Sequence, residues 1–423
     1  MKKHYLLPTS LILFLGFGSA FAASSKRFLI TDNGAIANGE TLNTSAIQKT
    51  IDTAAQEGGG TVVVPQGTFI SGALFLKPGV NLHLEKDAVL KCSNDLNNFP
   101  VQKTRIEGQF TQFNPALINA DKCDNLTITG EGTLDGSGRP VWDLFWKLRG
   151  EAEDKSNFRN QSIPRARLAL IENSQNVVID GISFKDSQFW NLHLYRCKNV
   201  TVKNVSISVP DDYKQAPSTD GIDIDSCQDV TIQSCTFSVT DDCIAMKGSK
   251  GPHALQDKDS PPVERVTVSD CTFKRGHAAV TLGSEATIVR GLTVKNCRVT
   301  GHMTLMTFKL RPDTPQHYED IHYSDITLDS SRGNLISIHP WKQYFDLKGE
   351  APPQSVVRNI SLTNITGKFG SLGTIQGNKG QTTISDITLK NIDVKLNSDS
   401  FRVRGVDGLK IEDVKVNGKP FSL

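Results

Sequence analysis

The stretch from Val230 to Phe237 reads Val-Thr-Ile-Gln-Ser-Cys-Thr-Phe. With Val230 as position zero, apolar residues stand at 0, +2, +5 and +7, and a small polar residue, Ser234, stands at +4. This frame occurs in nine repeats, whose starting points are 22 to 39 residues apart. The repeats begin at Val177, Val200, Val230, Val266, Leu292, Ile321, Ile360, Ile387 and Leu409. One repeat departs from the frame, because Gly367 stands at +7 of the repeat that begins at Ile360.

The frame predicts two short strands in each repeat. Residues two apart on a strand face the same side, so positions 0 and +2 and positions +5 and +7 face one core. Position +4 is Asn, Asp, Ser or Gly in all nine repeats, and Asn, Asp and Gly adopt the left-handed conformation of a sharp turn. Repeats of this length stack as the coils of a solenoid. We predict an all-β, single-domain parallel β-helix over residues 24–423; the alternative, a sandwich of β-hairpins, would not keep one frame through nine repeats.

A short amphipathic helix is predicted just before the first strands, which begin at Thr61. Ser45 and Gln48 have the spacing of a capping box at its start, and the glycines at 58–60 end it. Its apolar face comprises Ile47, Ile51, Ala54 and Ala55. A solenoid needs its terminal core covered, so we expect this helix to cap the first coil.

Residues 1–22 are typical of an export signal. Lys2 and Lys3 precede an apolar run, Leu11 to Phe17, and a small-residue cleavage site ends at Ala22. The alternative, an uncleaved membrane anchor, is disfavoured because the run is shorter than the roughly 20 residues that cross a bilayer. No later stretch is apolar enough to span a membrane. We expect a protein exported to the periplasm or the medium.

The charge balance argues against a nucleic-acid partner. The chain has 47 basic and 45 acidic residues, and removal of Lys2 and Lys3 leaves equal numbers. A nearly neutral chain offers no general attraction for a polyanion, although a locally basic cleft for an acidic substrate remains possible. The oligomeric state stays open.

Eight cysteines in an exported protein suggest disulfides. However, Cys235, Cys271 and Cys297 all occupy position +5, so we expect them to stack as small core residues on successive coils. Pairing among the other five remains open, and no close cysteine pair has the spacing of a zinc site. These five are Cys92, Cys123, Cys197, Cys227 and Cys243.

Three short polar clusters run directly into alternating apolar strands. Asp220 stands in the first, Asp241 and Asp242 in the second, and His277 in the third. Asp220 and Asp242 are 22 residues apart. We therefore expect them one above the other on successive coils, whose strands lie about 4.8 Å apart. His277 is expected to join this site, although an isolated histidine is more often structural.

Three crowded carboxylates repel one another, which raises the pKa of at least one. A protonated carboxyl beside an ionised one is what glycosidic bond cleavage requires, since one group protonates the leaving oxygen and another activates water. The alternatives for the same residues are a solvated ladder of aspartates or a calcium site.

These clusters resemble the motifs of glycoside hydrolase family 28, the polygalacturonases and related pectin hydrolases. The stretch 186–193, Asp-Ser-Gln-Phe-Trp-Asn-Leu-His, resembles the family's sequence one coil earlier, and its Trp190 is expected to contact substrate. The resemblance extends from about Asp32 to the end of the repeats. It implies a right-handed helix, hydrolysis with inversion, an acidic plant cell-wall polysaccharide or oligosaccharide as partner, and no cofactor or metal.

By this resemblance each cluster residue receives a role. Asp241 would be the general acid, and Asp220 with Asp242 would hold and deprotonate the water. His277 would tune the protonation of the acid and contact the sugar. Lys309 matches the lysine of an Arg-Ile-Lys motif that binds the uronate carboxylate, a role suited to a point charge.

The sequence departs from the family's motifs at three positions. Ser218 replaces an Asn, Ala278 a Gly and Thr307 an Arg. The last change removes a bidentate carboxylate contact, and Arg311 is the expected substitute. A modified galacturonan, a rhamnogalacturonan or a short oligosaccharide therefore stays open beside plain polygalacturonan.

Two segments, 142–160 and 250–262, are expected to build walls around the cleft, and closed ends would favour exo action. Two other functions remain: a polysaccharide lyase, which would use calcium and a basic residue, and a non-catalytic sugar-binding β-helix.

Overall fold

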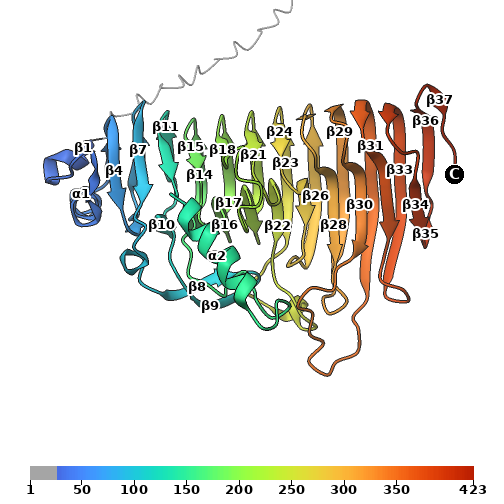
Figure 1. The fold of residues 1–423 in the computed structure, drawn as a ribbon, viewed down its shortest axis with the longest axis horizontal. Helices are drawn as coiled ribbons and strands as arrows, with labels where there is room; N and C mark the ends of the chain where they lie inside the picture. Colours follow the sequence, from blue (N-terminus) through green and yellow to red (C-terminus); the bar gives the residue numbers. More distant parts are fainter. Residues whose placement is uncertain (1–25) are drawn as a thin grey trace, which may run out of the picture.

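The computed structural model describes residues 26–423, so the predicted export signal lies outside the described residues. The chain forms the predicted right-handed parallel β-helix, whose coils stack along one long axis (Figure 1). Helix α1 (Thr44–Gln56) lies at one end of the stack, and strand β36 (Lys410–Val416) lies at the other. A second helix, α2 (Arg139–Glu151), lies beside the coils.

Two sheets run along this axis, and their strands are parallel apart from β37, which pairs antiparallel with β36. The larger, of 24 strands, contains both strands of each predicted repeat. Its strands are β1 Arg27–Leu29, β2 Asn38–Leu42, β3 Gly60–Val64, β4 Gly67–Ser71, β6 Val80–Leu84, β7 Ala88–Cys92, β11 Thr127–Gly130, β12 Thr133–Asp135, β14 Gln175–Asp180, β15 Ser183–Lys185, β17 Lys198–Lys203, β18 Ser206–Ser208, β20 Gln228–Gln233, β21 Thr236–Ser238, β23 Val263–Ser269, β24 Thr272–Arg275, β26 Ile288–Lys295, β27 Arg298–Val299, β29 His317–Asp329, β31 Ser355–Phe369, β33 Thr382–Leu396, β35 Val406–Asp407, β36 and β37 Lys419–Pro420.

The second sheet, of 11 strands, contains the strands that follow the polar clusters. They are β5 Leu74–Phe75, β10 Ile118–Asp121, β13 Ala169–Glu172, β16 Leu192–Tyr195, β19 Ile222–Asp225, β22 Ile244–Lys247, β25 Ala278–Leu282, β28 Thr304–Leu310, β30 Asn334–Pro340, β32 Ser371–Gln376 and β34 Phe401–Arg404. An antiparallel hairpin, β8 (Gln102–Ile106) with β9 (Gln109–Phe113), stands outside both sheets. Short 3-10 helices span Ile30–Asn33, Leu96–Asn98 and Ala254–Gln256.

The predicted sharp turn at position +4 is present in every repeat. All nine residues there have positive φ, from 49° at Asn391 to 82° at Gly181. The residue before position zero is also left-handed in all nine repeats, with φ from 54° to 71°. Eight of these are Asn, Asp or Gly, a signal that the sequence analysis missed, and the ninth is Arg265. Each repeat thus turns at two left-handed corners.

Replacement of a corner residue by a β-branched one should destabilise the coil. Asn204 has φ of 55° and donates a 2.8 Å hydrogen bond to Asp180 on the preceding coil. Asn204→Val should cost about 2 kcal/mol, because a β-branched residue is strongly disfavoured at positive φ. The matched variant Asn204→Gly should cost less, since it loses the hydrogen bond but keeps the conformation. Chemical denaturation of both variants measures this difference; equal stability would contradict the role of the corner.

Position +5 of each repeat faces the core, and position +7 does so too except at Gly367. Cys235, Cys271 and Cys297 are buried at successive +5 positions, as predicted, and all eight cysteines of the chain are buried and free. Gly367 has φ of 119°, and a Cβ there would clash with the carbonyl of Leu328 on the preceding coil. The departure from the frame therefore marks a position where the backbones approach too closely for a side chain.

Helix α1 caps the first coils, as predicted, and buries Ile47, Ile51 and Ala54. The predicted capping box is wrong. The helix begins at Thr44, so Ser45 lies inside its first turn, and the N-cap Asn43 makes no side-chain cap hydrogen bond. The Gln48 side chain instead bonds the backbone N–H and C=O of Phe75, which ties the helix to β5.

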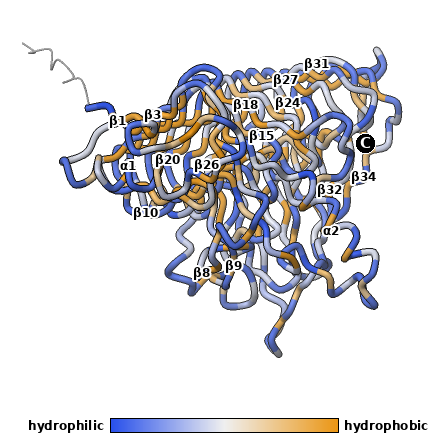
Figure 2. Tube along the Cα trace, turned by 60° about the vertical axis from the view of Figure 1, so that its left-hand side comes forward, coloured by the Kyte–Doolittle hydropathy of each residue, from blue (hydrophilic) through white to orange (hydrophobic). Residues whose placement is uncertain are grey.

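Apolar residues recur along the stacked strands, whereas the protruding loops are mostly hydrophilic (Figure 2). Helix α2, the β8–β9 hairpin and the loop after β30 all protrude on the same side of the coils (Figure 1). Within residues 26–423, neither helix has the length and apolar character needed to cross a bilayer.

Candidate active site

Strand register sets the positions of the polar clusters. Ile222 pairs with Ile244, and Ile244 pairs with Val280. Asp220 and Asp242 stand two residues before the paired isoleucines, so they occupy equivalent positions on adjacent coils, as predicted. The side chains of Ile222 and Ile244 point into the core, and the intervening positions of these strands therefore face outward.

A cleft of about 630 Å³ is lined by residues that lie just before these strands and by outward-facing lysines near the ends of β22 and β28. Asp220, Asp241, Asp242 and His277 all line it. Its basic side chains are Arg149, Lys214, Lys247, Arg275 and Lys309. Its aromatic side chains are Phe145, Trp146, Trp190, Trp341 and Tyr344. The surroundings of the carboxylates therefore combine positive charge with flat apolar faces.

One of the two predicted walls is present and one is not. Segment 142–160 lines the cleft through Trp146 and Asn160, among others. No residue of segment 250–262 lines it, and Ser260 of this segment accepts a hydrogen bond from Arg105 of the β8–β9 hairpin. The second wall is the loop after β30, which supplies Trp341, Gln343 and Tyr344. This loop carries no part of the repeat frame, so the sequence did not predict its place at the cleft.

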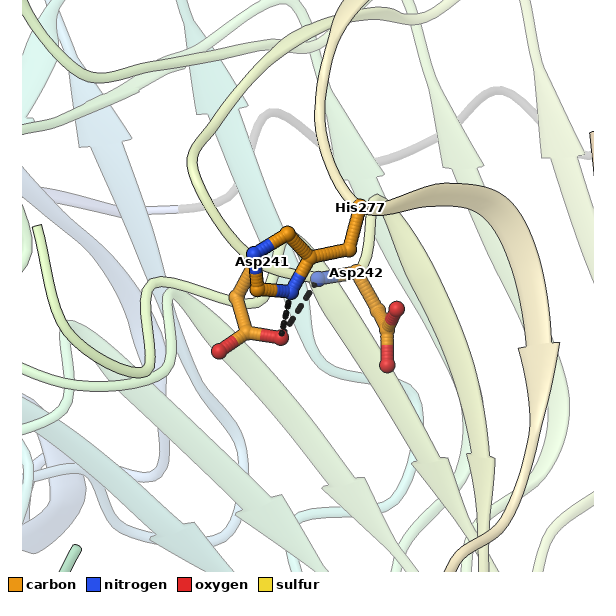
Figure 3. Close-up of side chains that lie close together, drawn as sticks. All are labelled: Asp241, Asp242 and His277. Atoms are coloured by element: carbon orange, nitrogen blue, oxygen red, sulfur yellow. Dashed lines mark hydrogen bonds and ion pairs between the residues drawn. The ribbon is translucent and has the colours of Figure 1, made fainter. Parts of the chain in front are cut away.

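His277 and Asp241 form an ion pair at the cleft surface (Figure 3). Nδ1 of His277 lies 3.2 Å from Oδ1 of Asp241, which also accepts the backbone N–H of Asp242 at 3.0 Å. Asp241 raises the pKa of His277 to about 9, so the ring is cationic at neutral pH. The Asp241 side chain is 27% exposed, against 5% for Asp220 and 1% for Asp242. Of the three carboxylates, Asp241 is the one that a ligand can reach most easily.

The carboxylates differ in protonation, as the crowding predicts. Burial, with help from Asp241, raises the pKa of Asp220 to about 7. Burial also raises the pKa of Asp241, but His277, Lys309 and Lys247 outweigh it and bring this pKa below its usual value. At pH 6 Asp220 and His277 are therefore mainly protonated in the unliganded site, whereas Asp241 is ionised. The family resemblance had assigned the acid role to Asp241, whose own carboxyl is ionised here.

Lys309 and Trp190 both lie in the cleft, as expected. Nζ of Lys309 donates a 2.7 Å hydrogen bond to Oδ2 of Asp242, and Oδ1 of that aspartate is buried without a partner among the described residues. Burial alone would lower the pKa of Lys309, but Asp242 and Asp241 raise it above its usual value.

The expected role of Arg311 is wrong. It lies just beyond the end of β28, is 2% exposed and does not line the cleft. Its guanidinium makes two 2.8 Å hydrogen bonds to Asp313 and donates to the carbonyls of Gln343 and Tyr344. Arg311 stands two residues after Lys309 and would share its strand face if β28 continued. The strand ends at Leu310, so the Arg311 side chain points into the protein, where it holds the loop of the second wall.

Lys247, at the end of β22, also lines the cleft and was not among the predicted site residues. Its Nζ lies 3.5 Å from Asp220, 3.7 Å from Asp223 and 3.9 Å from Glu285. Burial alone would lower its pKa, but these carboxylates raise it well above the usual value. The available signal was a lysine at the end of the strand that follows the second cluster.

Asp241, Asp242 and His277 offer three ligand atoms within 4.8 Å of one another. At neutral pH a metal ion could use this group only by displacing a ring proton of His277 and the ammonium of Lys309. A cationic His277 carries protons on both ring nitrogens and has no lone pair to donate. Lys309 also occupies one oxygen of Asp242.

Residues 61–415 match the model of the family described as glycosyl hydrolases family 28. The chain belongs to this family. Membership confirms the resemblance seen in the sequence and identifies the protein as a glycosidase.

Relatives within family 28 are distant in sequence. A probable polygalacturonase of Vitis vinifera is 29% identical over 63% of this chain, and the match spans about half of that relative, 53% of its length. An exopolygalacturonase of Zea mays is 26% identical over 80% of this chain and 76% of its own. The crystal structure of a hyperthermoactive exopolygalacturonase from Thermotoga maritima has 24% identity and a TM-score of 0.78, and it covers 94% of this chain and 93% of that one. At this identity the structural match supports the fold.

Of the three departures from the family 28 motifs, one lines the cleft and two lie on strands beneath it. Ser218 lines it and accepts a hydrogen bond from buried Arg165. Ala278 begins β25 and is buried. Thr307 pairs with Thr281 in β25 and does not line the cleft, so the cation expected at this position is missing from the site.

Proposed function

We propose that this protein is an exported hydrolase that cleaves galacturonic-acid-containing glycosidic bonds of pectin by inverting acid–base catalysis. The observation that carries the proposal is the pairing of Asp241 with His277 beside the pairing of Asp242 with Lys309, in one cleft rich in cations and indole rings. Carboxylates that differ in protonation serve glycoside hydrolysis, and the surrounding cations suit an acidic sugar.

Asp241 is the proton donor in this proposal. It is the most exposed of the three carboxylates, so the glycosidic oxygen can approach it. Its proton comes from His277, which holds one in the free enzyme and lies 3.2 Å away. Substrate that covers the pair excludes water, which disfavours the separated charges and favours transfer of the proton to Asp241.

Asp242 and Asp220 hold the attacking water. Oδ1 of Asp242 is buried and lacks a partner in the described chain, so it can accept a hydrogen bond from the water. The pKa of Asp220, about 7, suits a general base at neutral pH. Their equivalent positions on adjacent coils let both carboxyls contact one molecule.

Contacts between the two walls of the cleft support exo action. The hydroxyl of Tyr344 donates a 3.2 Å hydrogen bond to the carbonyl of Phe158, and the guanidinium of Arg159 lies 5.1 Å from the Tyr344 ring centroid. The two walls therefore meet, which blocks the passage of a long polysaccharide on that side. The names of the maize and Thermotoga relatives, both exopolygalacturonases, support the same mode.

Incubation of the purified protein with polygalacturonan should release saturated galacturonic acid from chain ends, with the anomer of inverted configuration. A chelator should leave the rate unchanged, because the site holds its charges with lysines and a cationic histidine. Nuclear magnetic resonance identifies the anomer, and chromatography gives product size. Rhamnogalacturonan, assayed in parallel, tests the second substrate class that the loss of an arginine at Thr307 favours.

An unsaturated product that requires calcium would instead show a lyase, and binding without turnover would show a sugar-binding β-helix. Sequencing of the mature N-terminus in the exported fraction tests cleavage after Ala22.

A further inference from the structure

We propose that a second groove, outside the catalytic cleft, binds acidic polysaccharide through Lys185 and Lys274. This groove holds a stretch of the polymer while the cleft acts on a chain end. The inference rests on the proposed function for the chemical class of the ligand, and it adds a binding site that the catalytic mechanism does not use.

The second groove has a volume of about 970 Å³ and follows the ends of the second strands of four successive repeats. Lys185, Ser208, Ser238 and Arg275 end strands β15, β18, β21 and β24, and all four line the groove. Lys185 pairs with Ser208, Ser208 pairs with Ser238, and Ser238 pairs with Arg275. Because neighbouring strands lie about 4.8 Å apart, these residues form a polar row along the axis of the coils.

A β-bulge adds a second lysine at one end of this row. Phe237 pairs with Phe273 and Ser238 pairs with Arg275, so Lys274 is an extra residue in β24. A bulge changes the direction in which a side chain points, and Lys274 is exposed and lines the groove. Lysines therefore stand at both ends of the row, three coils apart.

The loop 209–217 lies between the groove and the catalytic cleft. Residues 209–211 line the groove, whereas residues 214–217 line the cleft. The guanidinium of Arg275 donates hydrogen bonds to the carbonyls of Val209, Pro210 and Tyr213, which holds the loop in place. Since these acceptors are uncharged, Arg275 also adds a positive charge to the groove.

Cations outnumber carboxylates in the groove. Its acidic side chains are Asp186 and Asp211. Its basic side chains are Arg139, Lys185, Lys274, Arg275 and His302. The chain as a whole has 47 basic and 45 acidic residues, so this excess is local. Cations beside serine hydroxyls suit a ligand that carries both carboxylates and hydroxyls, which is an acidic glycan.

The lining of the groove disfavours a single-stranded nucleic acid. It contains no Phe, Tyr or Trp on which a base could stack. The distance between the lysines favours a polymer, because three coils separate their Cα atoms by about 14 Å. An extended chain of several acidic sugars spans this distance, whereas a single uronate does not.

Calorimetry on the Asp241→Asn protein, which prevents turnover, tests the groove. Polygalacturonate is titrated at low salt in the presence of saturating digalacturonate, which occupies the cleft. The double variant Lys185→Met/Lys274→Met should bind the polymer about 3- to 30-fold more weakly, the range expected for the loss of two exposed charge contacts. This difference should vanish near 1 M salt, where screening acts within about 3 Å. In the catalytically intact protein the same double variant should raise KM for the polymer and leave kcat unchanged.

Lys198→Met/Lys295→Met is the matched control, because both lysines are exposed on the same sheet and line neither the groove nor the cleft. It should change the affinity for the polymer by less than about two-fold, since distant exposed charges contribute little. Lys185→Arg/Lys274→Arg should retain most of the affinity. Where the methionine variant misfolds, Lys185→Gln/Lys274→Gln takes its place, and digalacturonate binding in the cleft reports on folding.

Equal polymer affinity in the native and double-variant backgrounds would overturn the groove as a binding site. Equal affinity for a fully methyl-esterified polymer would overturn the requirement for carboxylates, and equal affinity for polyphosphate would overturn the assignment to a glycan. Failure of the proposed function looks different: galacturonan would stay intact with the native protein, while its binding would still depend on Lys185 and Lys274.

Discussion

Asp241→Asn should reduce the rate of galacturonan hydrolysis by about 10³-fold, within the range that general acid catalysis contributes. Asparagine keeps the shape of the side chain and can still pair with His277, but it cannot donate a proton to a leaving oxygen. Binding of substrate should change little, because the lysines and indole rings of the cleft remain. The release of reducing ends, measured against substrate concentration, separates the fall in kcat from any change in KM.

Asp212→Asn is the control for this variant. Asp212 is exposed, pairs with Arg139 at 2.8 Å and does not line the active-site cleft. Its substitution should leave kcat and KM near the native values. A rate for Asp241→Asn above about a tenth of the native one would remove Asp241 from the role of general acid, whose loss costs at least about 10²-fold.

Asp220→Asn should stabilise the fold at pH 8 while it impairs hydrolysis. Burial raises the pKa of Asp220 to about 7 from a usual value of 3.8, so the folded state favours the neutral carboxyl. The contribution of this group to stability is complete below pH 3.8 and is lost as the pH rises to about 7. A neutral amide avoids that loss, which amounts to at most about 4 kcal/mol above pH 7. Denaturation of both proteins at pH 4 and pH 8 should show equal stability at the first pH and a more stable variant at the second.

Asp225→Asn, on the same coil, should have the opposite effect on stability. Burial raises the pKa of Asp225, but Arg105, 3.1 Å away, outweighs it, and the pKa falls below its usual value. Loss of one partner of a buried ion pair costs about 3–5 kcal/mol, so this variant should be less stable at pH 8. Equal changes in stability for the two variants at pH 8 would show that an ionised Asp220 does not destabilise the fold.

The β-helix was predictable from the sequence because the same pattern of apolar and polar positions recurs in each coil. A residue such as Ser234 at one corner means little alone, but nine polar corners in one frame define a solenoid. The second corner, at the residue before position zero, was not predicted. It lies outside the apolar frame, and Arg265 breaks the run of Asn, Asp and Gly at this position.

The site residues that stand at fixed positions relative to the repeated strands were predictable, and those that depend on contacts between coils or on loops were not. Register alone places Asp220 beside Asp242. The identity of the protonated group depends on burial and on neighbours from other coils, such as Lys247, whose distance from Asp220 the sequence does not give. Arg311 shows the same limit, because one residue past a strand's end is enough to change the direction of a side chain.

The left-handed corners and the protruding loops divide the coils into two unequal edges. A corner such as Asn204 is a single residue fixed by φ and by a hydrogen bond to the coil below, so an insertion there would displace every strand stacked on it. The opposite edge already accommodates the long segments that carry Trp146 and Tyr344 without altering the register of β19, β22 and β25. Evolution can therefore lengthen, shorten or exchange the cleft-facing loops while main-chain hydrogen bonds keep the spacing of Asp220 and Asp242 unchanged.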